Sequence, residues 1–241
     1  MKVEDFGVEI KKYLQELEIE LDENQIKQFY LFMQLLLEWN EKINLTTITD
    51  ENEIILKHFV DSLTVAKYIK KGAKVIDVGT GGGFPGIPLK IYRPDLDVVL
   101  LDSLNKRVNF LNDVIENLDL ESIKAIHGRA EDVGQDKKYR ESFDVAISRA
   151  VANMATLSEY LIPFVKVGGI AIAMKGPEIE EELNGAKKAI KILGGNILEK
   201  NIIKFYLPKT EISRTIIIVE KSANTDRKYP RKAGTPKKQP L

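Results

Sequence analysis

The sequence contains no cysteine and only two histidines, and these absences narrow its chemistry. Without thiols, the chain forms no disulfide, offers no thiolate to a metal and has no nucleophile for covalent attack on C5 of a pyrimidine. His58 and His127 lie far apart in the sequence, so we expect no metal-dependent mechanism. No stretch approaches the roughly 20 apolar residues of a membrane span. Met1–Asp5 also lacks the apolar core of a signal peptide, so we expect a cytoplasmic protein without a membrane partner.

Net charge is also absent, because 36 Lys and Arg residues balance 36 Asp and Glu residues. The balance hides an asymmetry: the last 21 residues, from Lys221 onward, carry seven basic residues and one acid, Asp226. The preceding 220 residues therefore carry 29 basic and 35 acidic residues. An acidic body with a basic tail favours a polyanionic partner, although a solvated, disordered end has the same composition.

Glycines are concentrated in one stretch, Lys74–Tyr92, around which the rest of the chain is organised. Lys74–Val78 is a short β-branched run that predicts a buried strand. An apolar pattern resumes beyond Pro85, which we place at the first position of a helix. In the loop between them, the residues without a Cβ atom let a ligand approach the backbone and the N–H groups of the helix. These residues are Gly79, Gly81, Gly82 and Gly83.

The residue two before the first glycine, Asp77, discriminates between cofactors. The loop also fits the dinucleotide fingerprint Gly-x-Gly-x-x-Gly, a weak signal by itself, which keeps an NAD-dependent oxidoreductase as an alternative. A carboxylate at this strand end, however, would repel a pyrophosphate. The pattern Asp-x-Gly-x-Gly-x-Gly resembles the first motif of S-adenosylmethionine (AdoMet) dependent methyltransferases, in which the carboxylate helps to hold the cationic methionine end. A glycine-rich turn without a ligand is the remaining interpretation.

The periodicity of the apolar residues divides the chain into three regions. Residues 1–70 are predicted to be an N-terminal helical extension, in which Asp22 and Gln25 resemble a capping box. Residues 71–221 alternate strand and helix and predict an α/β domain with a mainly parallel seven-stranded sheet, and residues 222–241 form the basic tail. A short connection between the last two strands predicts an antiparallel hairpin, as in the Rossmann-like AdoMet methyltransferase fold. The predicted strands are Lys74–Val78, Asp97–Asp102, Ile123–His127, Phe143–Ser148, Gly169–Met174, Asn196–Leu207 and Arg214–Val219.

Polar residues suited to a ligand follow successive strands of this predicted sheet. In an open parallel sheet the ligand lies across the carboxyl ends of the strands. Asp102 is placed there to accept both ribose hydroxyls of a nucleoside, and Ala130 and Glu131 are placed to bind adenine. Arg149 follows the fourth strand and offers a cation to the methionine end of the cofactor or to a substrate phosphate. A helix cap is the alternative for each acid, and a structural ion pair is the alternative for Arg149.

The residues after the fourth strand restrict the methyl acceptor. No Asn-Pro-Pro-Tyr motif follows this strand, which disfavours methylation of exocyclic amines by that route. The nucleic-acid chemistry that remains includes attack by a ring nitrogen with a free lone pair, such as N7 of guanine. Because this nitrogen carries no proton, its methylation requires only that N7 be aligned with the S–CH3 bond in a dry pocket. We therefore assign no catalytic acid or base, and we interpret His58, His127 and Trp39 as structural residues.

Several segments together carry a likeness to a known family. They resemble the bacterial small-subunit (16S) ribosomal RNA guanine-N7 methyltransferase family, also called glucose-inhibited division protein B, over nearly the whole chain. The phenylalanine-proline-glycine continuation of the glycine loop and the basic proline-containing tail are its specific features. The segments are Trp39–Thr46, His58–Leu63, Asp77–Gly86, Ser148–Ala150 and Tyr229–Lys237.

The resemblance implies AdoMet as the methyl donor and a guanine in the decoding region of rRNA as the acceptor. By position, the family's cofactor contacts fall on Gly79, Phe84, Ala130, Glu131 and Arg149, beside our own assignments of Gly81 and Asp102.

For the tail, we expect a mobile segment with little apolar content that holds RNA phosphates. Its basic residues assigned to RNA are Arg231, Lys232, Lys237 and Lys238. The partner is small-subunit rRNA or an assembling subunit. Which of these two is the substrate, the oligomeric state and the residues that contact the target guanine stay open. A non-catalytic ribosome-binding module with the same fold is a further alternative.

Overall fold

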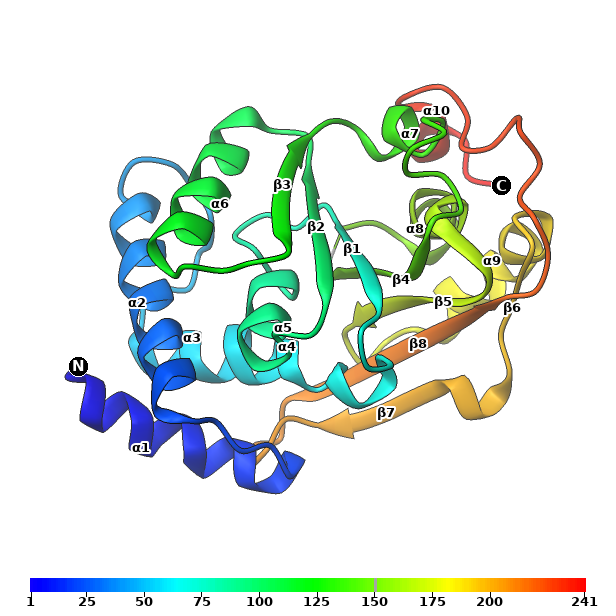
Figure 1. Cartoon of the computed structure of the whole chain (residues 1–241). Helices are drawn as coiled ribbons and strands as arrows, with labels where there is room; N and C mark the ends of the chain where they lie inside the picture. Colours follow the sequence, from blue (N-terminus) through cyan, green and yellow to red (C-terminus); the bar gives the residue numbers. More distant parts are fainter. Residues whose placement is uncertain (150) are drawn as a thin grey trace.

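A central sheet organises the chain, for which a computed structural model describes residues 1–149 and 151–241. Ala150, part of one motif quoted above, lies outside the described residues. The sheet has eight strands in the order β3-β2-β1-β4-β5-β8-β6, and β7 also pairs with β8 (Figure 1). The strands are β1 (Lys74–Val78), β2 (Asp97–Asp102), β3 (Ile123–His127), β4 (Phe143–Arg149), β5 (Val165–Lys175), β6 (Gly195–Asn196), β7 (Ile202–Tyr206) and β8 (Ser213–Lys221).

The first five strands are parallel, and β8 is antiparallel to β5, β6 and β7, which confirms the expected α/β class with a terminal hairpin. The strand order reverses between β1 and β4, so the carboxyl ends of these two strands border the crevice where open α/β sheets bind ligands.

The segment predicted as one strand, Asn196–Leu207, forms two strands. Asn196 pairs with Glu220, and the next pair joins Ile202 to Ile217. Between these two pairs, five residues of the predicted strand lie opposite only two residues of β8. The extra residues form the 3-10 turn η5 (Glu199–Asn201). The sheet consequently has one strand more than predicted.

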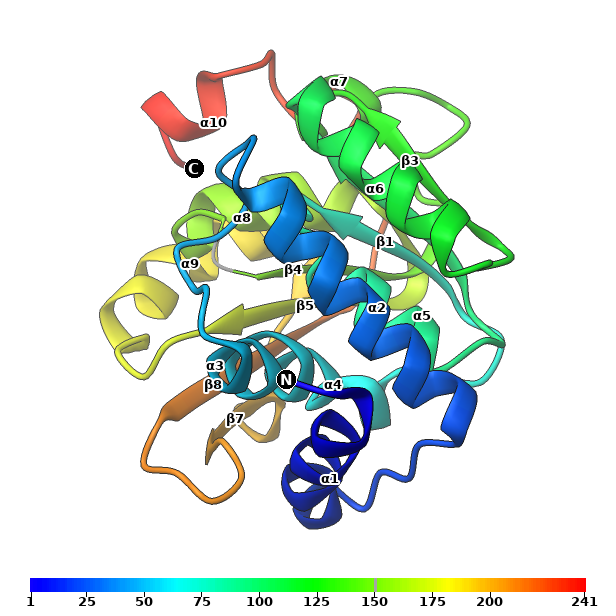
Figure 2. The same ribbon diagram turned by 90° about the vertical axis from the view of Figure 1, so that its left-hand side faces the viewer.

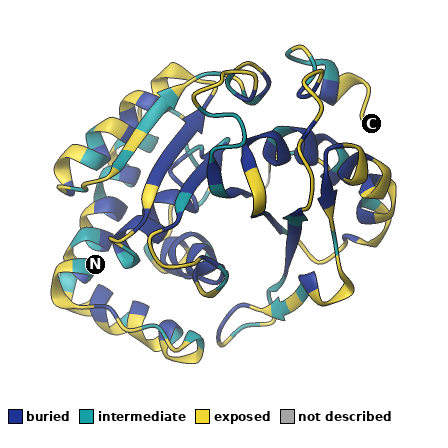
Figure 3. Cartoon of the chain, turned by 45° about the vertical axis from the view of Figure 1, so that its right-hand side comes forward, coloured by how far each residue is buried: buried dark blue, intermediate teal, exposed yellow. Residues whose placement is uncertain are grey.

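Alternating side chains of the strands build two cores, one on each face of the sheet. On β1, Val75 belongs to the core under the N-terminal helices, whereas Ile76 belongs to the opposite core under α8 and α9. Figure 3 shows buried strands between helices whose outer faces are exposed. The helices that follow the strands are α5 (Gly86–Tyr92), α6 (Asn105–Asn117), α7 (Ala130–Val133), α8 (Met154–Leu161) and α9 (Glu180–Ile192), with η4 (Ile162–Phe164) after α8.

The N-terminal helices share the first of these cores (Figure 2). The ring of Phe32 lies 5.5 Å from that of Phe59 and 5.3 Å from that of Phe84 in the glycine loop. The capping box of Asp22 and Gln25 is confirmed, with both reciprocal hydrogen bonds formed. The N-terminal elements are α1 (Val3–Leu14), η1 (Gln15–Leu17), α2 (Glu23–Asn40), α3 (Glu51–Ile54), a π-helical segment η2 (Ile55–Val60), α4 (Asp61–Leu63) and η3 (Ala66–Tyr68).

The tail folds back onto the body and ends in a short helix, α10 (Thr235–Lys238), near α7 and α8 (Figure 1). Tyr229 is 9% exposed and belongs to the second core. The guanidinium of Arg140 donates to backbone carbonyls at residues 225, 226 and 229. The expectation that this segment adds little to the core is wrong, because Tyr229 packs in the core and backbone carbonyls of the segment accept hydrogen bonds from Arg140. The composition of the segment reveals neither contact.

Among the described residues, no helix is both long and apolar enough to span a membrane.

Candidate functional site

The glycine loop after β1 is held open by the carboxylate that ends the neighbouring strand. Asp102 is 2% exposed; its Oδ2 accepts the N–H of Gly81 at 2.9 Å, and its Oδ1 accepts the N–H of Leu104 at 2.9 Å. Gly81 has a φ of +60°, and a Cβ placed on it would meet nothing within 4 Å. The backbone of the loop thus presents an unobstructed side next to Asp102. The helix-cap alternative for this acid is wrong, because Leu104 is the N-cap residue of α6 and no side chain among the described residues caps the helix; Asp102 accepts only the N–H of Leu104 itself.

The carboxylate of Asp77 accepts hydrogen bonds from one residue of the loop and from the first residue of α5. Its side chain is fully buried, and its Oδ2 accepts the hydroxyl of Thr80 at 2.6 Å and the N–H of Gly86 at 2.8 Å. Its Oδ1 is buried without a hydrogen-bond partner among the described residues. Burial raises the pKa of Asp77 to about 6. An unpartnered carboxylate oxygen here fits a cationic donor, which is what the ammonium group of a methionine end supplies.

The loop ends one residue later than predicted. Helix α5 begins at Gly86, and Pro85 occupies the N-cap position. A Cβ on Gly86 would lie 2.9 Å from Oδ2 of Asp77, so a glycine is required where the helix starts against this carboxylate. Gly79, with a φ of +71°, likewise has no room for a side chain, because a Cβ there would lie 2.9 Å from the side chain of Val151.

Glu131, predicted to bind adenine, lies in α7 next to Ala130 and is 7% exposed. Its Oε1 accepts the N–H of Gly234 at 2.8 Å, so the tail directly contacts a residue that the sequence predicts to bind the cofactor. Tyr160 of α8 lies close by, and its pKa is raised to about 12, chiefly by burial and further by the charge of Glu131. Sequence reasoning did not anticipate that the tail would contact this residue.

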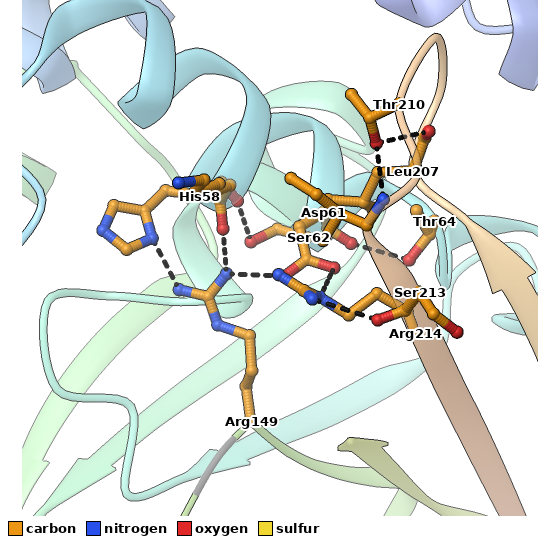
Figure 4. A network of polar contacts seen from close by, with 11 residues as sticks. His58, Asp61, Ser62, Thr64, Arg149, Leu207, Thr210, Ser213 and Arg214 are labelled. Atoms are coloured by element: carbon orange, nitrogen blue, oxygen red, sulfur yellow. Dashed lines mark hydrogen bonds and ion pairs between the residues drawn. The ribbon is translucent and has the colours of Figure 1, made fainter. Parts of the chain in front are cut away.

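Arg149, at the end of β4, is held by the N-terminal helices (Figure 4). Its Nη1 donates to the carbonyl of Lys57 at 3.0 Å and pairs with Oδ2 of Asp61 at 3.3 Å, and its Nη2 donates to Nδ1 of His58 at 3.1 Å. Asp61 is 3% exposed and also pairs with Arg214 of β8 at 3.3 Å. The ion-pair interpretation of Arg149 therefore describes part of its environment.

His58 and Arg149 both lie against the ring of Phe84. The imidazole stacks on this ring with centroids 4.4 Å apart, and the guanidinium carbon lies 4.9 Å from the ring centroid. Burial, and then the positive charge of Arg149, lower the pKa of His58 to about 3. His58 is consequently neutral at physiological pH. The signal for Asp61 was present in the sequence, since it is an acid one turn after His58 that directly follows the apolar pair Phe59-Val60.

His127 stands apart from this network. It is exposed, and its Nε2 lies 3.1 Å from the carbonyl oxygen of Ser103. Trp39 donates its indole N–H to Asp113 at 2.6 Å, which matches a packing anchor.

The four tail residues assigned to RNA differ in their surroundings. Lys232, Lys237 and Lys238 are exposed. Arg231 instead pairs with Glu159 of α8, whose side chain is 1% exposed. Nη2 of Arg231 lies 2.7 Å from Oε2, and its backbone N–H donates to Oε1 at 2.7 Å. The guanidinium of Arg231 is thus already engaged within the chain.

A mainly parallel sheet whose order reverses beside a glycine loop, and in which the antiparallel β8 lies next to β5, is the fold of the AdoMet-dependent methyltransferases. A solved SAM-dependent methyltransferase from Aquifex aeolicus matches this fold with a TM-score of 0.51 at 16% identity, covering 76% of this chain and 97% of that one.

The chain belongs to the rRNA small subunit methyltransferase G (GidB) family, whose model matches residues 25–208. The relative named Ribosomal RNA small subunit methyltransferase G from Desulforamulus reducens is 51% identical over 239 residues, covering 98% of this chain and 99% of the relative. The relative of the same name from Acetivibrio thermocellus is 54% identical over 224 residues, covering 92% of this chain and 91% of the relative. The resemblance drawn from the motifs is confirmed.

Proposed function

We propose that this protein transfers the methyl group of AdoMet to N7 of a guanine in small-subunit (16S) rRNA. The observation that carries the proposal is the glycine loop, fixed between Asp77 and Asp102 at the reversal point of the sheet, with Oδ1 of Asp77 left free. Membership of the rRNA small subunit methyltransferase G family supports the choice of substrate.

The residues around the loop suit the parts of the cofactor. Asp77 and Arg149 lie at the end assigned to the methionine group, whose ammonium and carboxylate they complement in charge. A carboxylate has about four acceptor positions, so Asp102 keeps capacity for ribose hydroxyls after accepting two backbone N–H groups and pairing with Arg107 at 3.5 Å. Ala130 and Glu131 follow β3 on the side assigned to adenine. When bound, AdoMet supplies a methyl group on a positively charged sulfur.

Guanine N7 needs no general base, because its lone pair is free to form the new C–N bond while the S–C electron pair returns to sulfur. The chain therefore acts by alignment and exclusion of water. Phe84 of the loop packs against His58 and Arg149, and the neutral His58 adds no second positive charge to that of Arg149.

The three regions have separate proposed roles. The domain at residues 71–221 carries the cofactor, and the helical region at residues 1–70 supplies the hydrogen-bond partners that hold Arg149. The tail at residues 222–241 contributes Lys232, Lys237 and Lys238 to RNA phosphates. Reaction on free rRNA or on an assembling subunit takes place in the cytoplasm under this proposal.

Transfer of labelled methyl from AdoMet tests the function. Small subunits, and 16S rRNA extracted from them, are prepared without the modification and incubated with the protein, and the modified base is then mapped by cleavage at N7-methylguanine. We expect one labelled guanine. Binding of AdoMet without transfer to either substrate would instead identify a non-catalytic module, and binding of NAD in place of AdoMet would identify an oxidoreductase.

A further inference from the structure

A directed chain of hydrogen bonds runs from Arg149 to the loop after α2. A guanidinium only donates, so Nδ1 of His58 accepts from Arg149 at 3.1 Å. A neutral imidazole that accepts at one nitrogen carries its proton on the other. Nε2 of His58 therefore donates to Oγ1 of Thr46, 2.8 Å away.

The hydroxyl of Thr46 receives a second donor from its own loop. The N–H of Ile48 donates to the same Oγ1 at 3.0 Å. A hydroxyl oxygen has two lone pairs, and both are now used. The hydroxyl proton of Thr46 is left to point outward as a donor, and it has no acceptor among the described residues. The side chain is half-buried and accessible to a ligand.

This donor lies next to the side chains that pack on Phe84 of the glycine loop. Oδ1 of Asn40 accepts the N–H groups of Leu45 at 2.8 Å and Thr46 at 3.0 Å, which fixes the loop. The imidazole that joins Thr46 to Arg149 stacks on Phe84, so a single ring separates the hydroxyl from the glycine loop. The segment that carries His58 is π-helical, a distortion frequent at functional sites.

We propose that the Thr46 hydroxyl donates a hydrogen bond to O6 of the target guanine and so selects guanine over adenine. The proposal rests on the proposed function. Guanine presents two neighbouring acceptors, N7 and O6, whereas adenine presents N7 beside an amino donor. With O6 held by Thr46, N7 stays free for the methyl group. Adenine would place its amino donor against a hydroxyl that Arg149 and His58 hold in the donor direction.

The test combines two variants of Thr46 with two bases at the target position. Thr46→Val removes the donor at nearly constant shape, and Thr46→Ser keeps it. The substrates are 16S rRNA assembled by ligation with either guanine or 2-aminopurine, which retains N7 but lacks O6. The readouts are kcat/KM for methyl transfer, and binding of AdoMet by calorimetry as a control on the fold.

With guanine, we expect Thr46→Val to lower kcat/KM about tenfold and Thr46→Ser to stay within about threefold of the wild type. With 2-aminopurine, the wild type and Thr46→Val are expected to agree within about twofold. A loss of equal size on both bases would mean that Thr46 only shapes the loop, and no loss on guanine would show that O6 is not read here; either result overturns the inference. If the wild type transferred no methyl group to guanine, the proposed function itself would fail first.

Discussion

Removal of the Arg231 guanidinium is expected to destabilise the fold, although sequence reasoning assigned this residue to RNA. Its partner Glu159 is 1% exposed, and Arg231→Met leaves that carboxylate buried with only the N–H of residue 231 as a donor from this pair. Breaking a buried ion pair from one side costs roughly 3–5 kcal/mol. Arg231 itself is 24% exposed, so we take the lower end, about 3 kcal/mol.

The assay is urea and thermal unfolding of Arg231→Met beside Lys232→Met, an exposed neighbour that serves as the matched control. For a chain of this size, about 3 kcal/mol corresponds to a fall in Tm of roughly 6–12 °C. Lys232→Met is expected to unfold like the wild type and to weaken RNA binding with a shallower salt dependence. A double variant, Arg231→Met with Glu159→Leu, should recover part of the lost stability because no unpaired charge remains.

The reverse pattern would refute this reasoning. If Arg231→Met unfolded like the wild type but bound RNA more weakly and with a shallower salt dependence, Arg231 would be a phosphate contact and the pair with Glu159 would contribute nothing measurable.

Three further perturbations address the cofactor site. Gly81→Val should abolish AdoMet binding, whereas Gly72→Val, at a similar φ of +68° and with equally open space, should bind normally; equal affinities in calorimetry would contradict the loop assignment. Asp77 has a folded-state pKa of about 6, above its unfolded value, so it contributes stability at low pH that is lost as pH rises from about 4 to 6. Asp77→Asn should remove this part of the pH dependence of unfolding and weaken AdoMet about tenfold, and an unchanged profile would show that the carboxyl titrates normally. A chain ending at Asn224 loses the Gly234 contact to Glu131, so its AdoMet affinity should fall about threefold; unchanged affinity would make the tail irrelevant to the cofactor.

Local patterns predicted most of the sheet and the loop. The β-branched run before the glycines gave β1 with correct bounds, and Asp22 with Gln25 gave the start of α2, because both depend on neighbours in the sequence. Asp102 was placed correctly at a strand end, since the carboxyl ends of parallel strands share one edge.

Local sequence patterns could not predict contacts between segments that lie far apart in the sequence. Gly234 lies 103 residues from Glu131, and Arg231 lies 72 residues from Glu159. The tail's composition is that of a solvated end, and only its partners in the fold show otherwise. Burial of His58 and Asp61 against β4 likewise depends on how the helical extension docks, which no spacing within it encodes.

Under the proposed assignments, the hydrogen bond between Gly234 and Glu131 links two binding events thermodynamically. The tail that carries the exposed lysines, proposed to bind RNA, also supplies a backbone donor to Glu131, which is proposed to bind the cofactor. Coupling between two ligands is reciprocal: the factor by which RNA on the lysines changes cofactor affinity equals the factor by which the cofactor changes RNA affinity. If these assignments hold, loss of the methyl group, which converts the sulfonium of the cofactor to a neutral thioether, is expected to change the affinity of the tail for the modified RNA.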